Sequence, residues 1–332
     1  MNSLDAMHAI TVPQPGGPEN IRWTEVPTPE PGPGEVLVRT IAAGVNRADL
    51  LQRQGHYPPP AGVTEVMGLE ASGIVEAVGQ GVTAWHPGDA VVALLAGGGY
   101  AEFFVAPAGQ VVRPPTGVDL VTASALMEVA ATVHSNMRHV HLIAGETLLV
   151  HGGAGGIGQF AIQYARGLGC RVGTTAGTPD KLEICRSLGA EIVLDYHDDW
   201  VAGLREATAG HGADVILDLM GAKYLDANLA ALAMDGRLCI IGMQGGVTGS
   251  LNIATLMAKR ATVTATGLRA RPLAQKAEIC ADVAASVWPL YERGLIQPPP
   301  LTRIPMPDAA AAHALLGSGT SSGKIALIAP SH

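Results

Sequence analysis

The stretch Glu146-Thr-Leu-Leu-Val-His-Gly-Gly-Ala-Gly-Gly-Ile-Gly158 runs from a short apolar segment into a glycine-rich loop. Gly153, Gly155 and Gly158 fall at the spacing G-x-G-x-x-G. Between a strand and a helix, glycines at this spacing allow a tight turn, let a pyrophosphate approach bare backbone and let the helix pack closely on its strand. The N–H groups that open such a helix face an anion. The stretch therefore predicts a dinucleotide site, with a purely structural turn as the alternative.

The sequence on either side supplies the strand and the helix that this motif needs. Leu148–Val150 has the pattern of a buried strand, and apolar residues recur at helical spacing from Ile157 to Leu168. Further strands and helices then alternate, which predicts a parallel sheet with helices on both faces. We expect strands at 148–150, 171–175, 191–194, 214–217, 237–241 and 261–266, and helices at 120–126, 128–141, 156–168, 179–188, 200–208, 223–234 and 272–293.

The N-terminal third consists instead of short β-type runs separated by proline and glycine. Pro27–Gly34 and His86–Asp89 have the composition of turns. The pattern predicts a compact, mostly antiparallel β domain, and Gly323–Ile328 predicts a strand that returns to it. Met1–Ala6 is interpreted as an N-terminal extension without a role. The expected strands are 8–12, 21–26, 35–43, 71–78, 89–95 and 100–106.

Composition limits the classes of function. The 332 residues are enough for about two domains. A formal net charge of −8 argues against a nucleic-acid partner. No apolar run reaches the ~20 residues that span a bilayer, and the N-terminus lacks the blocks of a signal peptide, so we expect no membrane partner and a cytoplasmic location. Cys170, Cys185, Cys239 and Cys280 are scattered and are expected to be small core residues.

The corner after the second strand of the parallel sheet indicates which dinucleotide binds. An NAD site normally has Asp or Glu there, about 20 residues past the loop, to bind the ribose 2′-hydroxyl. Here the strand ends in Ala176-Gly177, and the nearest acid, Asp180, lies in a helix that Thr178 is expected to cap. The positive charge of Lys181 in the first turn opposes the helix dipole, which is mildly unfavourable unless an anion lies nearby. A 2′-phosphate is such an anion. The corner favours NADPH, with a solvated surface lysine as the alternative.

Later loops leave the same edge of the predicted sheet. Tyr196 follows the third strand and could flank the adenine or the phosphate, with a partly exposed aromatic residue as the alternative. Asp218–Gly221 and Gly242–Gly246 follow strands four and five, where the nicotinamide half should lie.

In the β domain, Leu95–Tyr100 is either a wall of the substrate cleft or a plain β turn. Three histidines at 134, 139 and 141 are interpreted as helix-surface residues.

These residues together resemble the medium-chain dehydrogenase/reductase superfamily, and within it the zinc-independent NADPH:quinone oxidoreductases of the zeta-crystallin-like and tumour-suppressor-inducible branch. The resemblance covers essentially the whole chain. It implies an α/β protein with a Rossmann doubly wound parallel-sheet domain at 129–268 and a mostly antiparallel β, GroES-like catalytic domain at 1–128 and 269–332. It rests on Ala43–Tyr57, Gly68–Gly73, the glycine loop, Thr175–Thr178 with Lys181, and Gly323–Ile325.

The resemblance also implies site residues. Asn46 and Tyr57 match residues that line the quinone and nicotinamide cleft, and they are the candidate catalytic residues. The zinc-dependent relatives carry a Cys ligand and a Gly-His-Glu ligand where this chain has Asn46 and Gly68-Leu69-Glu70, so no metal is expected. Together with the loop and corner residues, the candidate cofactor contacts are Asn46, Thr132, Gly153, Gly155, Gly156, Ile157, Gly158, Thr175, Gly177, Thr178, Lys181, Tyr196, Gly242, Met243, Leu268, Arg269 and Lys324.

The loss of the zinc ligands indicates the class of substrate. Hydride addition to a simple ketone develops localised charge, which zinc would stabilise. Addition to a quinone or an α,β-unsaturated carbonyl spreads the charge, so hydrogen-bond donors can suffice. We expect hydride transfer from NADPH to a quinone in an interdomain cleft, with Tyr57 and Asn46 as donors. The alternatives are a 2-alkenal or enoyl reductase and a non-catalytic NADPH-binding sensor or structural protein.

The last strand of the parallel sheet suggests a partner. Ala261–Gly267 is rich in β-branched residues and is expected to be an edge with unpaired backbone groups. Members of the family that this chain resembles dimerise through this strand. We therefore expect a homodimer that pairs the two edges.

Overall fold

A computed structural model describes residues 6–330 of the chain. These residues divide into two compact units. Unit 1 takes in the residues up to Ala131, Leu268–Glu292 and the residues from Pro300 onward, and unit 2 takes in Thr132–Gly267 and Arg293–Pro299. The N-terminal extension expected from the sequence lies outside the described residues except for Ala6, which already belongs to a strand.

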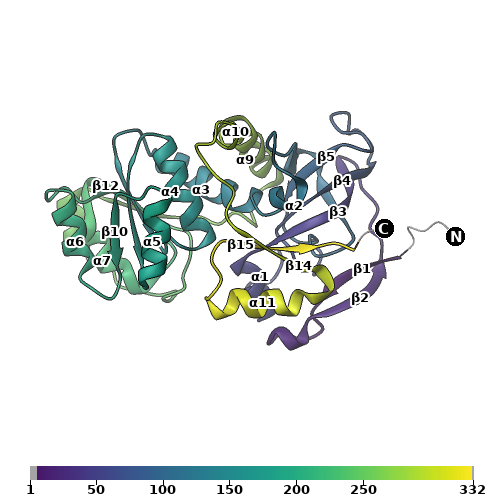
Figure 1. Cartoon of the computed structure of the whole chain (residues 1–332), viewed down its shortest axis with the longest axis horizontal. Helices are drawn as coiled ribbons and strands as arrows, with labels where there is room; N and C mark the ends of the chain where they lie inside the picture. The colour runs from purple at the N-terminus through teal and green to yellow at the C-terminus, as the bar shows by residue number, and fades with distance from the viewer. Residues whose placement is uncertain (1–5, 331–332) are drawn as a thin grey trace. The chain divides into compact units, whose positions relative to one another are not determined.

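Unit 2 is built on a six-stranded parallel sheet with strand order β10-β9-β8-β11-β12-β13 (Figure 1). The chain builds the sheet outward from β8 in one direction and then returns to build it in the other. The doubly wound sheet is therefore confirmed, and its order reverses at the carboxyl end of β8, where sheets of this kind bind ligands. The strands are β8 (Thr147–His151), β9 (Arg171–Ala176), β10 (Ile192–Asp195), β11 (Ala213–Asp218), β12 (Leu232–Ile240) and β13 (Thr262–Ala265).

Helices connect these strands and bury the apolar sheet. Fully buried Leu149, Ile216 and Leu238 come from three neighbouring strands and form one cluster with residues of the helices. The helix expected at 223–234 is shorter than predicted, because β12 already begins at Leu232. The connecting elements are α4 (Gly156–Gly167), α5 (Pro179–Ser187), α6 (Trp200–Ala207), η3 (Gly221–Tyr224), α7 (Leu225–Ala231) and α8 (Ile253–Lys259), and α3 (Met127–His139) precedes β8.

Unit 1 contains the predicted β domain. Its seven-stranded sheet has the order β14-β15-β3-β4-β5-β7, with β6 also paired to β3, and β1 and β2 form a separate pair. Every pairing is antiparallel except that of β14 with β15. The strands are β1 (Ala6–Thr11), β2 (Arg22–Pro27), β3 (Glu35–Val45), β4 (Glu70–Val78), β5 (Ala90–Leu94), β6 (Phe103–Pro107), β7 (Val111–Val112), β14 (Leu301–Pro305) and β15 (Lys324–Ile328).

The C-terminal residues complete this unit. Strand β15 pairs with β3, which confirms that the end of the chain returns to the first domain. The long helix expected at 272–293 is interrupted at Val287, because the ring of Pro289 cannot continue a helix past the carbonyl of Ala285. The helices are α1 (Arg47–Arg53), α2 (Leu120–Ala123), α9 (Leu273–Ser286), α10 (Trp288–Glu292) and α11 (Ala309–Ser318), with short 3₁₀ turns at η1 (Pro18–Asn20), η2 (Ala108–Gln110) and η4 (Met306–Asp308).

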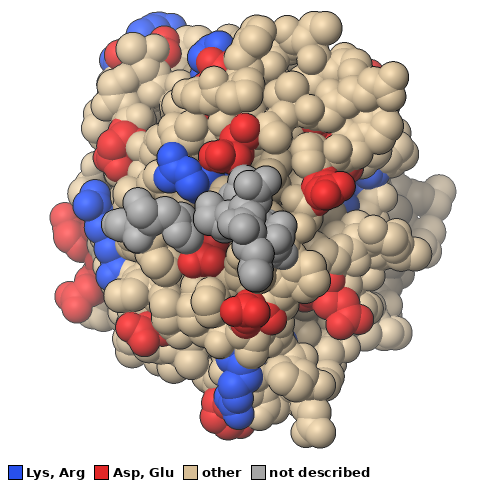
Figure 2. Space-filling view, turned by 90° about the vertical axis from the view of Figure 1, so that its right-hand side faces the viewer, with Lys and Arg blue, Asp and Glu red and all other residues tan. Residues whose placement is uncertain are grey.

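The distribution of surface charges and the burial of the cysteines agree with what the composition predicts. Figure 2 shows one face of the molecule, on which acidic and basic side chains are scattered among uncharged ones. Within residues 6–330, no helix combines the length and the hydropathy needed to cross a bilayer. All four cysteines are buried and unpaired, as predicted. Burial raises the pKa of Cys170 and Cys185 to about 11 and that of Cys280 to about 12.

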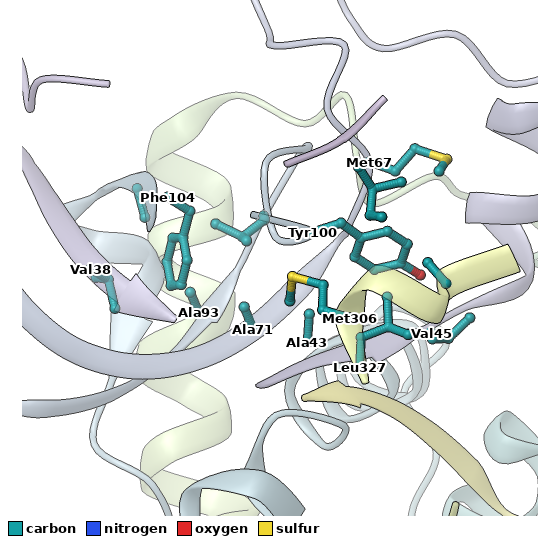
Figure 3. Close-up of a cluster of buried hydrophobic side chains, with 14 of the residues drawn as sticks. Val38, Ala43, Val45, Met67, Ala71, Ala93, Tyr100, Phe104, Met306 and Leu327 are labelled. Atoms are coloured by element: carbon teal, nitrogen blue, oxygen red, sulfur yellow. The ribbon is translucent and has the colours of Figure 1, made fainter. Parts of the chain in front are cut away.

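The core of unit 1 surrounds a buried tyrosine. Figure 3 shows the Tyr100 ring among apolar side chains that include Val45 and Met306. Tyr100 is fully buried, so its hydroxyl needs a partner inside the protein. It donates to Oδ2 of the equally buried Asp49, 2.8 Å away. Burial raises the pKa of Asp49 to about 6, because hydrogen bonds from Asn46 and Tyr100 offset only part of the desolvation.

Replacing Asp49 by asparagine tests this buried carboxyl. The ordinary pKa of 3.8 rises to about 6 on folding, so the folded protein keeps a proton that the unfolded chain releases between these values. The group therefore contributes stability below about pH 4 that is lost as the pH rises through 6. Relative to Asp49→Asn, the free energy of unfolding of the natural chain should fall from pH 4 to 6 and then level off. Denaturant unfolding at pH 4, 5, 6 and 7 measures the difference, and a pH-independent difference would contradict the expectation.

Candidate functional site

The glycine loop after β8 is held by close backbone packing. A Cβ on Gly158 would lie 2.4 Å from the Gly152 carbonyl oxygen and 2.5 Å from Gly153 Cα. A Cβ on Gly153 would lie 2.1 Å from Thr174 Oγ1. The left-handed turn itself falls on Gly152, whose φ is +71°, one residue before the predicted motif. The first turn of α4 is thereby seated directly on the loop.

Gly155 differs from its neighbours. The nearest atom to a Cβ built there is the Gly152 carbonyl oxygen at 3.5 Å, so packing does not demand glycine at this position. Gly155 is the N-cap of α4, a helix of 12 residues, and it provides no side-chain cap for the first N–H groups. Bare backbone at the positive end of a helix dipole suits a phosphate. Gly155, Gly156 and Ile157 therefore fit the pyrophosphate contact expected from the sequence.

A buried hydrogen-bond chain supports this loop from behind. His151 is almost fully buried, with Nε2 2.7 Å from Asn228 Oδ1 and Nδ1 3.1 Å from Thr175 Oγ1. Thr175 Oγ1 in turn accepts the N–H of Gly152 at 3.3 Å. Burial lowers the pKa of His151 to about 4, so the ring is neutral at pH 7 and can donate from Nε2 and accept at Nδ1. The hydroxyl of Thr175, a residue predicted as a cofactor contact, is engaged in positioning the loop.

The predicted 2′-phosphate residues meet at one corner of the sheet. Thr178 caps α5 and accepts the N–H of Lys181 at 3.3 Å, as the sequence predicts. A Cβ on Gly177 would lie 2.1 Å from Tyr196 Cζ, so the tyrosine ring lies against this glycine. The side chain of Tyr196 is half-exposed. Asp195, at the end of β10, accepts hydrogen bonds from the backbone and ring of His197.

The loops after β11 and β12 also lie together. The buried carboxylate of Asp218 accepts the N–H groups of Met220 and Gly221 at 2.7 and 2.9 Å, which fixes the turn after β11. A Cβ on Gly242 would lie 2.7 Å from the Leu219 carbonyl oxygen, and Met243 beside it is exposed. Both loops leave carboxyl ends of parallel strands, the edge at which the cofactor is expected.

In unit 1, three predicted positions converge in one polar triad, defined as Asn46, Glu70 and Lys324. Lys324 Nζ lies 2.6 Å from Asn46 Oδ1 and 2.7 Å from Glu70 Oε1. Asn46 Nδ2 donates to the same Glu70 oxygen at 2.9 Å, and Glu70 is fully buried. The second carboxylate oxygen of Glu70 accepts the N–H of Glu128 at 2.9 Å. Asn46 is therefore held in one amide orientation.

Strand pairing explains the polar triad. Asn46 follows β3, while Glu70 begins β4 and Lys324 begins β15, the two strands that flank β3. Gly44 leaves room for the carboxylate, because a Cβ there would lie 2.3 Å from Glu70 Oε1. Lys324, predicted as a cofactor contact, is buried and bonded inside the triad.

The donor set of the polar triad does not fit zinc. An amide, an ammonium group and one carboxylate replace the thiolate, imidazole and carboxylate donors that zinc prefers. The Lys324 ammonium is itself bonded to the carboxylate oxygen that a cation would need. Across residues 6–330, no cluster of three or more His, Cys, Asp or Glu side chains could hold a metal ion.

Tyr57 is positioned by Arg269. The Arg269 guanidinium lies 5.0 Å from the centre of the Tyr57 ring and donates to the Tyr57 carbonyl at 3.0 Å. It also donates to the Ala96 carbonyl and to Gln52 Oε1, both at 2.7 Å. Burial raises the pKa of Tyr57, an effect that Arg269 opposes and Glu128 reinforces. The Tyr57 phenol is thus protonated at neutral pH and can donate a hydrogen bond.

The remaining predicted residues lie apart from these clusters. Thr132 is a half-buried residue of α3, and Leu268 is half-buried between β13 and α9. The interpretation of all three histidines as helix-surface residues is wrong for His134. It is buried, and its Nδ1 lies 2.7 Å from Tyr164 Oη, because His134 continues the apolar stripe of α3.

Comparison with known proteins covers both units. Residues 32–116 match the model described as alcohol dehydrogenase GroES-like domain. Residues 156–280 match the model described as zinc-binding dehydrogenase.

Similar proteins extend over nearly the whole chain. A quinone oxidoreductase of Pseudomonas aeruginosa is 33% identical over 317 residues, covering 94% of this chain and 97% of that protein. A 2-haloacrylate reductase of a Burkholderia species is 32% identical over 333 residues, covering 96% and 98%. The crystal structure of Escherichia coli quinone oxidoreductase complexed with NADPH is 30% identical, with a TM-score of 0.87 and coverage of 97% and 99%. With this fold, these site positions and these relatives, the chain belongs to the medium-chain dehydrogenase/reductase superfamily, together with the quinone oxidoreductases.

Proposed function

We propose that this chain is an NADPH-dependent quinone oxidoreductase. The assignment of NADPH as the cofactor rests on one corner of the parallel sheet, next to the uncapped start of α4. This corner is formed by Gly177, Thr178, Lys181 and Tyr196. It offers bare backbone for a pyrophosphate and a lysine for a further phosphate. The similarity to an enzyme whose crystal structure contains NADPH supports the same cofactor here.

The residues of unit 1 are suited to a soft acceptor. NADPH supplies the hydride from C4 of its nicotinamide ring. Tyr57 and Asn46 would donate hydrogen bonds to the carbonyl oxygen of the acceptor, where charge develops. The raised pKa of Tyr57 keeps its proton in place, and Lys324 with Glu70 fixes the Asn46 amide. Because quinone reduction spreads the charge over a ring, neutral donors can suffice without a metal.

A second candidate is reduction of an activated C=C bond. The similarity to a 2-haloacrylate reductase favours it. The same two donors would then face the carbonyl of an α,β-unsaturated substrate. An acceptor screen with ortho-quinones, para-quinones and 2-alkenals compares the two, and tight NADPH binding without turnover would instead favour a sensor or structural role.

Lys181→Met should separate NADPH from NADH. Removing a charged donor from a phosphate costs about 1.5–3 kcal/mol, so the Kd for NADPH should rise at least tenfold. The Kd for NADH, which lacks the 2′-phosphate, should change less than twofold, and Lys181→Arg should keep most of the NADPH affinity. Titration of cofactor fluorescence measures all three. An equal loss for both cofactors would remove Lys181 from phosphate recognition.

Tyr57→Phe should lower kcat while leaving the Kd for NADPH nearly unchanged. The ring and its contact with Arg269 are kept, and only the donor is lost. Loss of one donor to a developing oxyanion typically lowers kcat by 10²–10³. Because Asn46 would remain as a second donor, we expect a smaller decrease in kcat, of at least roughly tenfold. Steady-state NADPH oxidation with a quinone measures kcat. Unchanged turnover would exclude a catalytic role for Tyr57.

We also propose a homodimer formed through β13. This strand ends the parallel sheet, and Thr262 and Ala265 on it are exposed. Light scattering should give a mass near twice that of the 34.1 kDa chain, and Thr262→Lys should shift it toward the monomer. A monomeric natural chain would contradict the proposal. The expected cytoplasmic location belongs to the same proposal, and cell fractionation would test it.

A further inference from the structure

Unit 1 contains a cavity of about 690 Å³ that the proposed reaction leaves unassigned. This volume lies in the range of small-molecule sites. Neither Tyr57 nor Asn46 is among the described residues that line it. Apolar side chains from several strands and loops supply most of its wall, including Val26, Val63, Val66, Leu95, Phe104 and Val105.

The wall of the cavity includes a buried cation. Lys276 lines the cavity with 4% of its surface exposed. Its Nζ donates a long hydrogen bond of 3.4 Å to the carbonyl oxygen of Arg269, and no carboxylate of the described residues is bonded to it. Burying a charge without a counter-charge is costly. Lys276 also lies in the first turn of α9, where the helix dipole disfavours a cation.

The wall of the cavity also includes a second buried donor without an acceptor. Gln110 lines the cavity and is 1% exposed, and its buried Nε2 has no hydrogen-bond partner within the described chain. Pro272, at the N-cap of α9, supplies no side-chain cap for the first N–H groups of that helix. Glu35, a carboxylate that also lines the cavity, already accepts the N–H of Gly32 at 2.9 Å.

We propose that this cavity binds an elongated apolar molecule that ends in a carboxylate. The carboxylate would pair with Lys276 and accept from Gln110, while the apolar body would lie along the valine and phenylalanine side chains. An uncharged molecule of the same shape would leave the ammonium group without a counter-ion. A small anion would leave the apolar wall exposed to water. The inference depends on neither the quinone nor NADPH.

Titration calorimetry on the full chain tests the site with three probes at neutral pH, namely decanoate, decan-1-ol and acetate. Decanoate should bind at least tenfold more tightly than either of the others. Lys276→Met keeps the length of the side chain and removes its charge, and should weaken decanoate binding at least tenfold. Lys276→Arg keeps the charge and should stay within about threefold of the natural chain.

Lys181→Met serves as the matched control, because it removes one lysine from the other unit. It should leave the Kd for decanoate unchanged even if it weakens NADPH binding. Failure of the decanoate site and failure of the proposed cofactor site are therefore distinguishable. Equal affinity for decanoate and decan-1-ol, or no decanoate binding to the natural chain, would overturn the proposal without any variant. Full decanoate affinity in a folded Lys276→Met protein would also overturn it.

Discussion

The seating of α4 on the glycine loop is the constraint on which the rest of unit 2 depends. Gly158 lies so close to the backbone of Gly152 and Gly153 that any side chain would push the helix away from β8. With the helix seated, its uncapped first turn opens at the carboxyl edge of the sheet. The corner at Lys181 and the loops after β11 and β12 leave the same edge. Close packing at Gly153 and Gly158 thus places the first turn of α4 at the edge of the sheet from which these other segments leave.

Unit 1 is organised around a buried ion pair. The Glu70 carboxylate accepts from the Lys324 ammonium, the Asn46 amide and the backbone N–H of Glu128, so its charge is satisfied without water. Removing one member of such a pair would leave a buried charge uncompensated. This would destabilise the folded protein far more than burying the intact pair does. The lysine occupies the carboxylate lone pair that a metal ligand set would use. The ammonium group of Lys324 therefore lies where a metal ion would bind the carboxylate. Unlike a metal ion it is part of the chain, and it also fixes the orientation of the Asn46 amide.

The sequence alone predicted much of the local structure, and less of the contacts between residues that lie far apart in the chain. The alternation of strands and helices and the glycine spacing predicted the parallel sheet, because both depend on neighbouring residues. The sequence pattern did not predict the short α8, and it missed the break near Pro289 although a proline within a helical pattern is a strong local signal. His134 was placed on the surface because histidine is polar, although its position continues the buried face of α3.

The site showed a similar division. Thr178 and Lys181 were readable because an N-cap is a short-range pattern. The contact of Lys324 with Glu70 joins residues 254 positions apart, and that of Arg269 with Tyr57 spans 212 positions. Periodicity cannot predict such pairs, since only the sheet order brings β15 beside β3. Asp49 and Tyr100 were missed for the same reason, because their hydrogen bond joins residues 51 positions apart.

The burial of the four cysteines has a consequence for an enzyme proposed to handle quinones. Quinones are electrophiles that add to thiolates, and the thiolate is the reactive form of cysteine. In this chain Cys170, Cys185 and Cys280 have pKa values raised by burial to about 11 or 12, so their sulfur stays protonated at neutral pH as well as shielded. The fold thereby protects the catalyst from alkylation by its own substrate.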